Sequence, residues 1–261
     1  MQVHVLASGS DGNSTVVTEG NTAILIDAGL GPRQLKTRLA PLGIALADVE
    51  ACFLTHEHTD HISGMRRHSY PKVQLIGNLP TLTEVCEVPF IGTRYPCCEQ
   101  RIGATITVGS LSVTSFSVSH DSAASVGYIV RSPSAQLVYA TDLGVASSEL
   151  HAALTEADYV VLEANHDMDM LRTGPYPYNL KRRVAGRKGH LANDQTAALL
   201  VSCLSERTKW LALAHLSRTN NTPKIALQTI EQSLIGRLGL HPDLRVQAAP
   251  SAISGLPPVS S

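Results

Sequence analysis

The chain has 261 residues, of which 43% are hydrophobic and 16% are charged. This composition excludes a disordered chain and suffices for the core of one large domain. The formal net charge of −1 excludes a general electrostatic attraction to nucleic acid, so any anion must bind at a local patch.

The cysteine pattern and the N-terminal residues indicate the compartment. The five cysteines are an odd number and include no Cys-x-x-Cys pair, so we expect a reducing, cytoplasmic environment. The N-terminal residues lack the basic and long apolar regions of a signal peptide. No apolar run approaches the length of a membrane span, so no membrane partner is expected.

Apolar runs alternate with glycine, proline and polar residues, which is typical of an α/β protein. Strands are expected at residues 3–7, 16–18, 23–27, 51–54, 73–76, 105–108, 111–118, 125–130, 137–140, 159–163, 210–214 and 244–248. Helices are expected from residue 32 to Gly43, at 79–86, near Glu149, at 196–204 and at 223–235. Residues 89–104 are expected to form an irregular connection. We predict one domain over residues 1–248 and a flexible tail at 249–261.

A small polar loop, Ser-Gly-Ser-Asp-Gly-Asn-Ser, follows the first expected strand at residues 8–14. Its backbone N–H groups could form a nest for a phosphate, with Ser10 and Asn13 among the contacts. An ordinary hairpin turn is an equal alternative. Asp27 ends a later strand and could accept a hydrogen bond from a metal-binding imidazole, or it could simply form a turn.

The segment from Thr55 to His61 is Thr-His-Glu-His-Thr-Asp-His, and it directly follows the apolar run at residues 51–54. Imidazole and carboxylate groups are ligands that Zn²⁺ and similar metals accept. One metal cannot easily take four ligands from so short a loop, whereas two adjacent metals could take two each. This spacing indicates a metal site rather than an ordinary polar surface loop.

The pattern His-x-His-x-Asp-His resembles the metal-binding signature of the metallo-β-lactamase-fold hydrolases. The resemblance implies an α/β fold, the αββα sandwich, in which two mixed β-sheets are flanked by helices and two metals lie at their edge. Further apolar strands are followed by His120, Asp142 and His215. The family pattern implies one metal at His56, His58 and His120, a second at Asp60, His61 and His215, and Asp142 as the bridge.

The expected cofactors are two divalent ions, since His and Asp sites accept Zn²⁺, Mn²⁺ and Fe²⁺. Such a pair, about 3.5–4 Å apart, lowers the pKa of bound water towards about 7 and polarises a phosphoryl or carbonyl oxygen. Asp60 could also orient the attacking hydroxide. A bridging carboxylate such as Asp142 is similar to the nuclease, phosphodiesterase and glyoxalase branches rather than to the lactamases.

A second pair of residues is expected to handle protons. His190 begins a Gly-His-Leu-like segment that resembles the one supplying an extra His in tRNA 3′-processing endonucleases. Residues 160–165 resemble the His-Glu-Ala-Thr stretch of the same enzymes, with Leu162 in place of the His and Glu163 retained. We predict that His190 protonates the leaving oxygen and that Glu163 fixes its tautomer. The alternatives are a plain strand-end carboxylate and a polar residue at a helix start.

A basic segment at residues 181–188 precedes His190. We favour phosphate recognition there over a solvated basic loop, because guanidinium and ammonium groups suit phosphate oxygens. Tyr176 and Tyr178 could stack on bases, although their proline neighbours indicate loop packing equally well. The candidate substrate contacts are Arg183, Arg187, Lys188 and, lining the cleft, His166.

Eight segments, from Ser-Gly-Ser-Asp-Gly-Asn-Ser at residue 8 to His-Leu-Ser-Arg-Thr-Asn-Asn at residue 215, resemble in order the bacterial YycJ/WalJ-like subfamily. This resemblance covers about residues 1–230. It implies a 5′→3′ DNA exonuclease acting in DNA repair, with largely sequence-independent backbone contacts. The alternatives are a small-molecule or cyclic phosphodiesterase, another metallo-hydrolase, and a non-catalytic metal-binding regulator. Expected partners are DNA or another phosphodiester, and a homodimer is one option for assembly.

Overall fold

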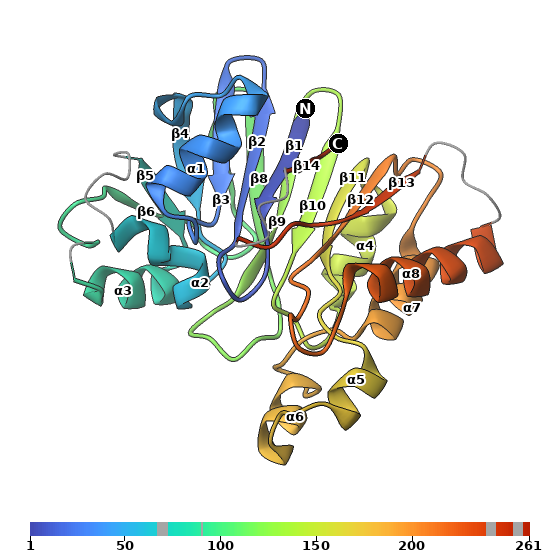
Figure 1. Ribbon diagram of the computed structural model, residues 1–261. Coiled ribbons are helices and arrows are strands. Elements are labelled where there is room, and N and C mark those ends of the chain that lie inside the picture. Colours follow the sequence, from blue (N-terminus) through green and yellow to red (C-terminus); the bar gives the residue numbers. More distant parts are fainter. Residues whose placement is uncertain (67–72, 90, 239–243, 253–257) are drawn as a thin grey trace.

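Two β-sheets lie face to face, and helices cover their outer faces (Figure 1). The computed structural model describes residues 1–66, 73–89, 91–238, 244–252 and 258–261. Within these residues the strand order is β14-β1-β2-β3-β4-β5-β6 in one sheet and β13-β12-β11-β10-β9-β8-β7 in the other. Both sheets combine parallel and antiparallel neighbours. The predicted αββα sandwich of two mixed sheets is therefore confirmed.

The strands of the first sheet are β1 (Gln2–Ala7), β2 (Ser14–Glu19), β3 (Thr22–Ile26), β4 (Val49–Phe53), β5 (Gln74–Gly77), β6 (Cys97–Glu99) and β14 (Val259–Ser260). Those of the second are β7 (Thr105–Val108), β8 (Leu111–Ser117), β9 (Val126–Arg131), β10 (Gln136–Ala140), β11 (Tyr159–Glu163), β12 (Trp210–Ala214) and β13 (Arg245–Ala248). The helices are α1 (Pro32–Leu39), α2 (Thr59–Ile62), α3 (Leu79–Glu87), α4 (Ser148–Thr155), α5 (Met168–Thr173), α6 (Tyr178–Val184), α7 (Asn193–Cys203) and α8 (Pro223–Leu238).

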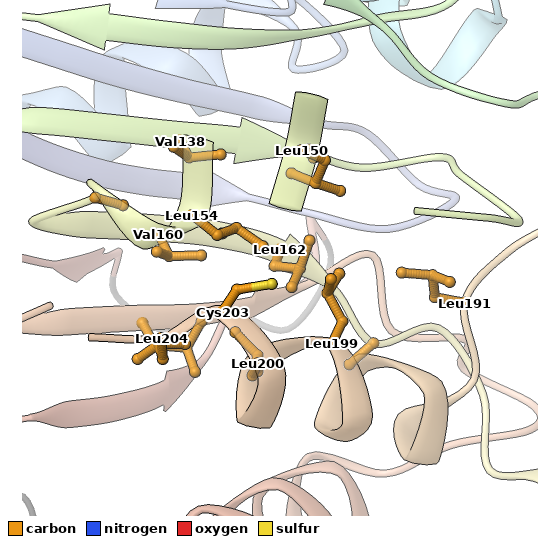
Figure 2. Close-up of a cluster of buried hydrophobic side chains, with 14 of the residues drawn as sticks. Val138, Leu150, Leu154, Val160, Leu162, Leu191, Leu199, Leu200, Cys203 and Leu204 are labelled. Carbon is orange, nitrogen blue, oxygen red and sulfur yellow. The ribbon is translucent and has the colours of Figure 1, made fainter. Parts of the chain in front are cut away.

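Three buried hydrophobic clusters hold the layers together. One lies between the sheets and contains side chains of both, among them Phe53, Tyr128 and Trp210. A second packs α1 and α3 against the first sheet, and a third packs α4, α7 and α8 against the second (Figure 2). Central strands such as β3 and β12 are buried on both faces, which is why their sequences are continuous apolar runs.

Local signals in the sequence account for several helix ends. Pro32 occupies the first turn of α1, and Gly43 ends the following 3-10 turn in the left-handed conformation at φ 72°. The Ser147 hydroxyl accepts a hydrogen bond from the Leu150 N–H, and Asp167 caps Met170 in the same way. These caps stop α4 and α5 from extending backwards into the site-bearing loops.

The structure corrects one sequence expectation and assigns an element to a segment that had none. The connection at 89–104 contains β6, which pairs in parallel with β5. In the basic segment, residues Lys181 to Arg183 belong to α6. Both segments are short. Whether each forms a strand or a helix depends on contacts with residues distant in sequence, so the local pattern could not identify them.

The C-terminal residues that are described pack against the body of the protein. Ala252 is buried beside the first sheet, and Val259 and Ser260 pair antiparallel with Val5 and His4 of β1. The division into a domain at 1–248 and a tail at 249–261 stays a prediction. No helix in the described parts of the chain is long and apolar enough to cross a membrane.

We expect Leu200→Ala to lower the free energy of unfolding by about 2–5 kcal/mol, because Leu200 on α7 is fully buried in the cluster of Figure 2 and its truncation removes apolar contacts and leaves a cavity. Denaturant unfolding would measure the change. Ile235→Ala on α8, where Ile235 is 55% exposed, is the control and should change stability by only about 0.5 kcal/mol. Equal losses in the two variants would contradict the packing described.

Candidate metal centre and active site

The candidate site lies where strands of both sheets end. Asp27 follows β3, His120 follows β8, Asp142 follows β10 and His215 follows β12. Strands β10, β11 and β12 are parallel, and β8 runs the same way because β9 is antiparallel to both β8 and β10. Their carboxyl ends therefore share one edge, which is the usual location of sites in such sheets.

Three of these strand-end residues adopt a backbone conformation that residues other than glycine rarely adopt. Asp27, Asp142 and His215 have φ values of 62°, 58° and 53°, the positive-φ residues other than glycine in the described chain. This left-handed geometry turns each chain sharply as it leaves the sheet. Such strain persists only where surrounding contacts over-determine it, and it tends to occur at functional sites.

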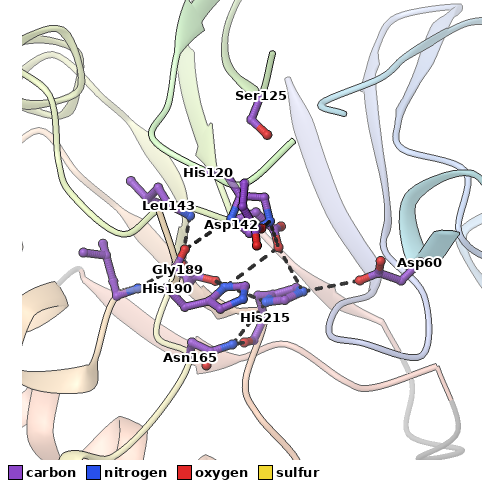
Figure 3. Close-up of polar contacts among 12 residues, drawn as sticks. Asp60, His120, Ser125, Asp142, Leu143, Asn165, Gly189, His190 and His215 are labelled. Carbon is purple, nitrogen blue, oxygen red and sulfur yellow. Dashed lines mark hydrogen bonds and ion pairs between the residues drawn. The ribbon is translucent and has the colours of Figure 1, made fainter. Parts of the chain in front are cut away.

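The expected metal ligands form two groups with a shared carboxylate. The two groups are His56, His58, His120 and Asp60, His61, His215, and within each of them one potential ligand atom of every residue lies within 4.8 Å of the others. A further group of this kind, His56, His61 and Asp142, joins the two. Asp142 thus lies between the two predicted sets, 3.8 Å from His120 Nε2 of the first and 3.3 Å from His215 Nε2 of the second (Figure 3). The residues that the family pattern implies as ligands therefore lie together, and their binding of metal stays a prediction.

Three buried polar atoms in this cluster make no hydrogen bond to the described part of the protein. The Nε2 atoms of His56 and His215 and the Oδ2 atom of Asp142 are buried and make no hydrogen bond within the described residues. A buried polar atom without a partner is costly. Imidazole nitrogens and a carboxylate oxygen that converge in this way fit a divalent cation, so the donor set is suited to a metal.

Asp27, directly after the end of β3, orients two imidazoles of the cluster. Its carboxylate is fully buried and accepts a 2.8 Å hydrogen bond from His61 Nδ1–H and a 2.9 Å bond from the Thr55 backbone N–H. The Thr55 hydroxyl donates to the same carboxylate and lies 3.0 Å from His56 Nδ1. Both imidazoles are thereby fixed with Nε2 facing the cluster, which is the role predicted for Asp27.

Glu163, on the second sheet, is also fully buried, and its carboxylate likewise orients imidazoles of the cluster. One carboxylate oxygen accepts from His190 Nδ1–H at 2.8 Å and lies 3.1 Å from His215 Nδ1. The other accepts the backbone N–H groups of Leu143 and Leu191, each at 3.1 Å. The expected His190–Glu163 pair is therefore present, whereas Leu162, which replaces the family's His, lies in the hydrophobic core.

Carboxylates and imidazoles of the site shift one another's pKa values towards the charged forms. Burial alone would raise the pKa of Asp60, but the imidazoles of His61 and His215 outweigh it and hold that pKa below its usual range. Burial likewise opposes ionisation of Glu163, yet His190 and His215 keep its pKa low. Burial lowers the pKa of His190, but the Glu163 carboxylate more than offsets this and raises it.

The loop at 8–14 is a hairpin connection that braces the metal-binding segment. Asn13 is buried, accepts from the Gly9 N–H at 2.8 Å and places its amide nitrogen 3.2 Å from Asp60 Oδ2. Gly29 lies so close to Asp60 that a Cβ would meet its carbonyl oxygen at 1.8 Å, so only glycine fits there. The loop connects the antiparallel strands β1 and β2, Ser10 is its member in the cavity wall, and its contact with phosphate stays a prediction.

A cavity of about 270 Å³ opens onto the cluster. Of the predicted substrate contacts, Ser10 and Arg183 line it, and His190 lies in its wall beside the metal-binding residues. Asn13 and His166 are buried behind that wall, and Arg187 and Lys188 are exposed outside it. His166 lies 3.3 Å from Asn165 Oδ1 through Nδ1.

Sequence reasoning missed three polar residues that hold the site in shape. Thr55 links Asp27 to His56, and Asn165 donates to the His215 carbonyl at 2.8 Å. Asp121 accepts from Arg183 Nε at 2.6 Å and so joins the loop after β8 to α6. Their adjacency to His56, Glu163 and His120 was the available signal, but the direction of each side chain depends on the fold.

Structural comparison identifies the class of fold. The Zn²⁺-bound PqqB of Methylobacterium extorquens matches with a TM-score of 0.71 at 18% identity, over 100% of this chain and 99% of that one. The metallo-beta-lactamase fold protein YhfI of Bacillus subtilis matches with a TM-score of 0.70 at 15% identity, over 96% and 97% of the two chains. At these identities the likeness shows a metallo-β-lactamase fold and nothing finer.

The sequence comparison is more specific. Residues 22–211 match the family described as the beta-lactamase superfamily domain, and the chain belongs to this family. It is 34% identical over 250 residues to the exodeoxyribonuclease WalJ of Streptococcus pneumoniae, covering 93% of this chain and 91% of that protein. It is also 34% identical over 244 residues to the exodeoxyribonuclease YycJ of Bacillus anthracis, covering 88% of each. The resemblance to the YycJ/WalJ-like subfamily is thereby confirmed.

We expect Asp27→Asn to weaken the binding of Zn²⁺ or Mn²⁺ by about 10- to 100-fold, because an amide holds the His61 imidazole less well than a carboxylate does. Asparagine is chosen because it tolerates the positive φ of this position. Calorimetric metal titration would measure the change. Asp169→Asn, which alters an exposed carboxylate on α5, is the control, and an unchanged affinity in Asp27→Asn would contradict the assigned role.

Proposed function

We propose that this chain is a dinuclear metal-dependent phosphodiesterase that removes nucleotides from DNA ends, most simply as a 5′→3′ exonuclease in DNA repair. The observation that carries the proposal is the pair of ligand groups that share Asp142 at the base of a cavity, next to the His190–Glu163 pair. The relatives named exodeoxyribonuclease at 34% identity supply the substrate class.

The proposed ligands are His56, His58 and His120 for one ion, Asp60, His61 and His215 for the other, and Asp142 for both. We propose Zn²⁺ or Mn²⁺, with Fe²⁺ also compatible with this donor set. When bound, such a pair supplies Lewis acidity towards a phosphoryl oxygen and makes hydroxide available near neutral pH. The protein contributes fixed imidazole orientations through Asp27 and Glu163.

His190 is proposed to donate a proton to the leaving oxygen. Its Nδ1–H is bound to Glu163, so its other ring nitrogen is the one available to the cavity that His190 lines. The carboxylate fixes the ring orientation and favours the protonated imidazole, as a general acid requires.

Asp60, which also lines the cavity, is proposed to orient the attacking water as well as to bind metal.

Phosphate recognition is proposed for Ser10 and Arg183 at the cavity wall, with Arg187 and Lys188 contacting the DNA backbone further out. Arg183 is held by Asp121 and is largely exposed, so its guanidinium can reach an incoming phosphate. Contacts of this kind are independent of base sequence and weaken as salt increases.

The first test is degradation of 5′-phosphorylated DNA by Mn²⁺-loaded protein. We expect release of mononucleotides from the 5′ end and loss of this activity in Asp60→Ala, because Asp60 belongs to one ligand group and lines the cavity. Asp169→Ala on exposed α5 is the control and should remain active. Turnover of a small phosphodiester without any DNA cleavage would move the substrate to the small-molecule class, and inactivity on both would favour a non-catalytic role.

His190→Ala separates a proton donor from a metal ligand. His190 also falls within 4.8 Å of Asp142, Glu163 and His215, so it could in principle coordinate an ion. We expect the variant to keep its metal content while kcat falls by about 10²- to 10⁴-fold, the typical contribution of general acid catalysis. His151→Ala on α4 is the matched control at an exposed position. Loss of metal from His190→Ala would instead identify His190 as a ligand.

A further inference from the structure

The cavity at the metal centre has two chemically different walls. One wall consists of the imidazoles and carboxylates described above together with Ser10 and Ser217. The other comes from a single segment, residues 174–184, and presents Tyr176, Leu180 and Val184 with Arg183 among them. Binding of a phosphodiester accounts for the first wall and for Arg183, but the aromatic and aliphatic side chains of Tyr176, Leu180 and Val184 require a second explanation.

The segment that supplies this wall stands apart from the sheets. Helices α5 and α6 project from the body below the strand ends (Figure 1). They are tied to each other by Lys181 Nζ, which donates to the Arg172 carbonyl at 2.9 Å. The Asp121–Arg183 ion pair and the 2.7 Å bond from the Ser119 hydroxyl to the Arg187 carbonyl hold this segment against the loop after β8. We call residues 168–184 the arm.

Tyr176 is held in a fixed position at the turn of the arm. It lies between Pro175 and Pro177, whose rings restrict the backbone on both sides. Gly174 immediately before it packs so closely that a Cβ would meet the Met170 carbonyl oxygen at 2.5 Å. The Tyr176 ring is half-buried, lines the cavity and makes no ring contact or side-chain hydrogen bond within the described chain. The backbone at Tyr176 is therefore restricted, and its aromatic side chain is available to a ligand in the cavity.

Tyr178, two residues further on, has a different environment. It is 72% exposed, does not line the cavity, and its ring faces the guanidinium of Arg182 at 5.9 Å. The two tyrosines that the sequence presents as equivalent are thus separated by the fold. Only Tyr176 can meet a group whose phosphate lies against the metal-binding wall.

We propose that Tyr176, with Leu180 beside it, forms a subsite that stacks the base of the terminal nucleotide while its phosphate lies at the metal centre. This inference rests on the proposed nuclease function and names the part of the substrate that the arm recognises. Every base has a π-face, so stacking is tolerant of sequence, as expected for an enzyme that must process any DNA end. The cavity volume of about 270 Å³ is small for a ligand-binding site, and it suits a ligand of the size of a single nucleotide.

The test compares two 5′-phosphorylated single-stranded oligonucleotides that differ only at the terminal nucleotide. One carries a normal base, and the other carries a tetrahydrofuran abasic analogue. We expect the unaltered protein to favour the normal end in kcat/KM by roughly 5- to 150-fold, the range that corresponds to one base–aromatic stack. Tyr176→Ala should lose most of this preference, and Tyr176→Phe should keep it because the ring remains.

Tyr178→Ala is the matched control, since Tyr178 lies on the same arm outside the cavity and should leave the preference unchanged. Tyr176→Leu, which keeps apolar volume without the ring, replaces Tyr176→Ala if the latter loses metal or melts earlier. If the unaltered protein degrades both oligonucleotides equally, or Tyr176→Ala and Tyr176→Leu keep the preference, the stacking subsite is wrong while the nuclease function stands. If no DNA is degraded at all, the proposed function itself fails.

Discussion

Two buried carboxylates, Asp27 and Glu163, are the constraint on which this site depends. Each is fully buried at the end of a strand, one in each sheet, and each would be strongly unfavourable there without donors. Asp27 is satisfied by His61 and Thr55, and Glu163 by His190, His215 and two backbone N–H groups. The cost of burying each charge is offset only in one arrangement of the surrounding loops, so the carboxylates specify the geometry of the imidazoles.

This arrangement leaves buried polar atoms of the cluster without a hydrogen bond in the described chain, and that makes the cluster suited to a metal. They are Nε2 of His56, Nε2 of His215 and Oδ2 of Asp142, and His215 Nε2 lies 3.3 Å from the other carboxylate oxygen of Asp142. Like-oriented imidazoles and nearby carboxylates are stable together only when a cation or protons share them. The positive φ values of Asp27, Asp142 and His215 are the backbone strain that accompanies this convergence.

Function is then divided between the rigid sandwich and the arm. The sandwich and its connections supply the candidate ligand groups, which follow β4, β8, β10 and β12, and the His190–Glu163 pair, in which His190 lies between α6 and α7. The arm, whose helices α5 and α6 lie outside both sheets (Figure 1), contributes Tyr176 from the turn between these helices and Arg183 from α6 to the cavity wall. Chemistry on a phosphodiester would depend on the first part and choice of substrate on the second, as is common when loops vary on a fixed scaffold.

The sequence by itself predicted the fold class, the candidate ligand residues that the fold brings together and the contact between His190 and Glu163, because apolar strands are followed by His and Asp and because the motif order is shared with a known subfamily. It could not separate Tyr176 from Tyr178, place Asn13 and His166 behind the cavity wall, or pair Asp121 with Arg183. Those outcomes depend on side-chain directions and on contacts between segments distant along the chain. Such contacts have no local period or spacing, so only the tertiary structure decided them.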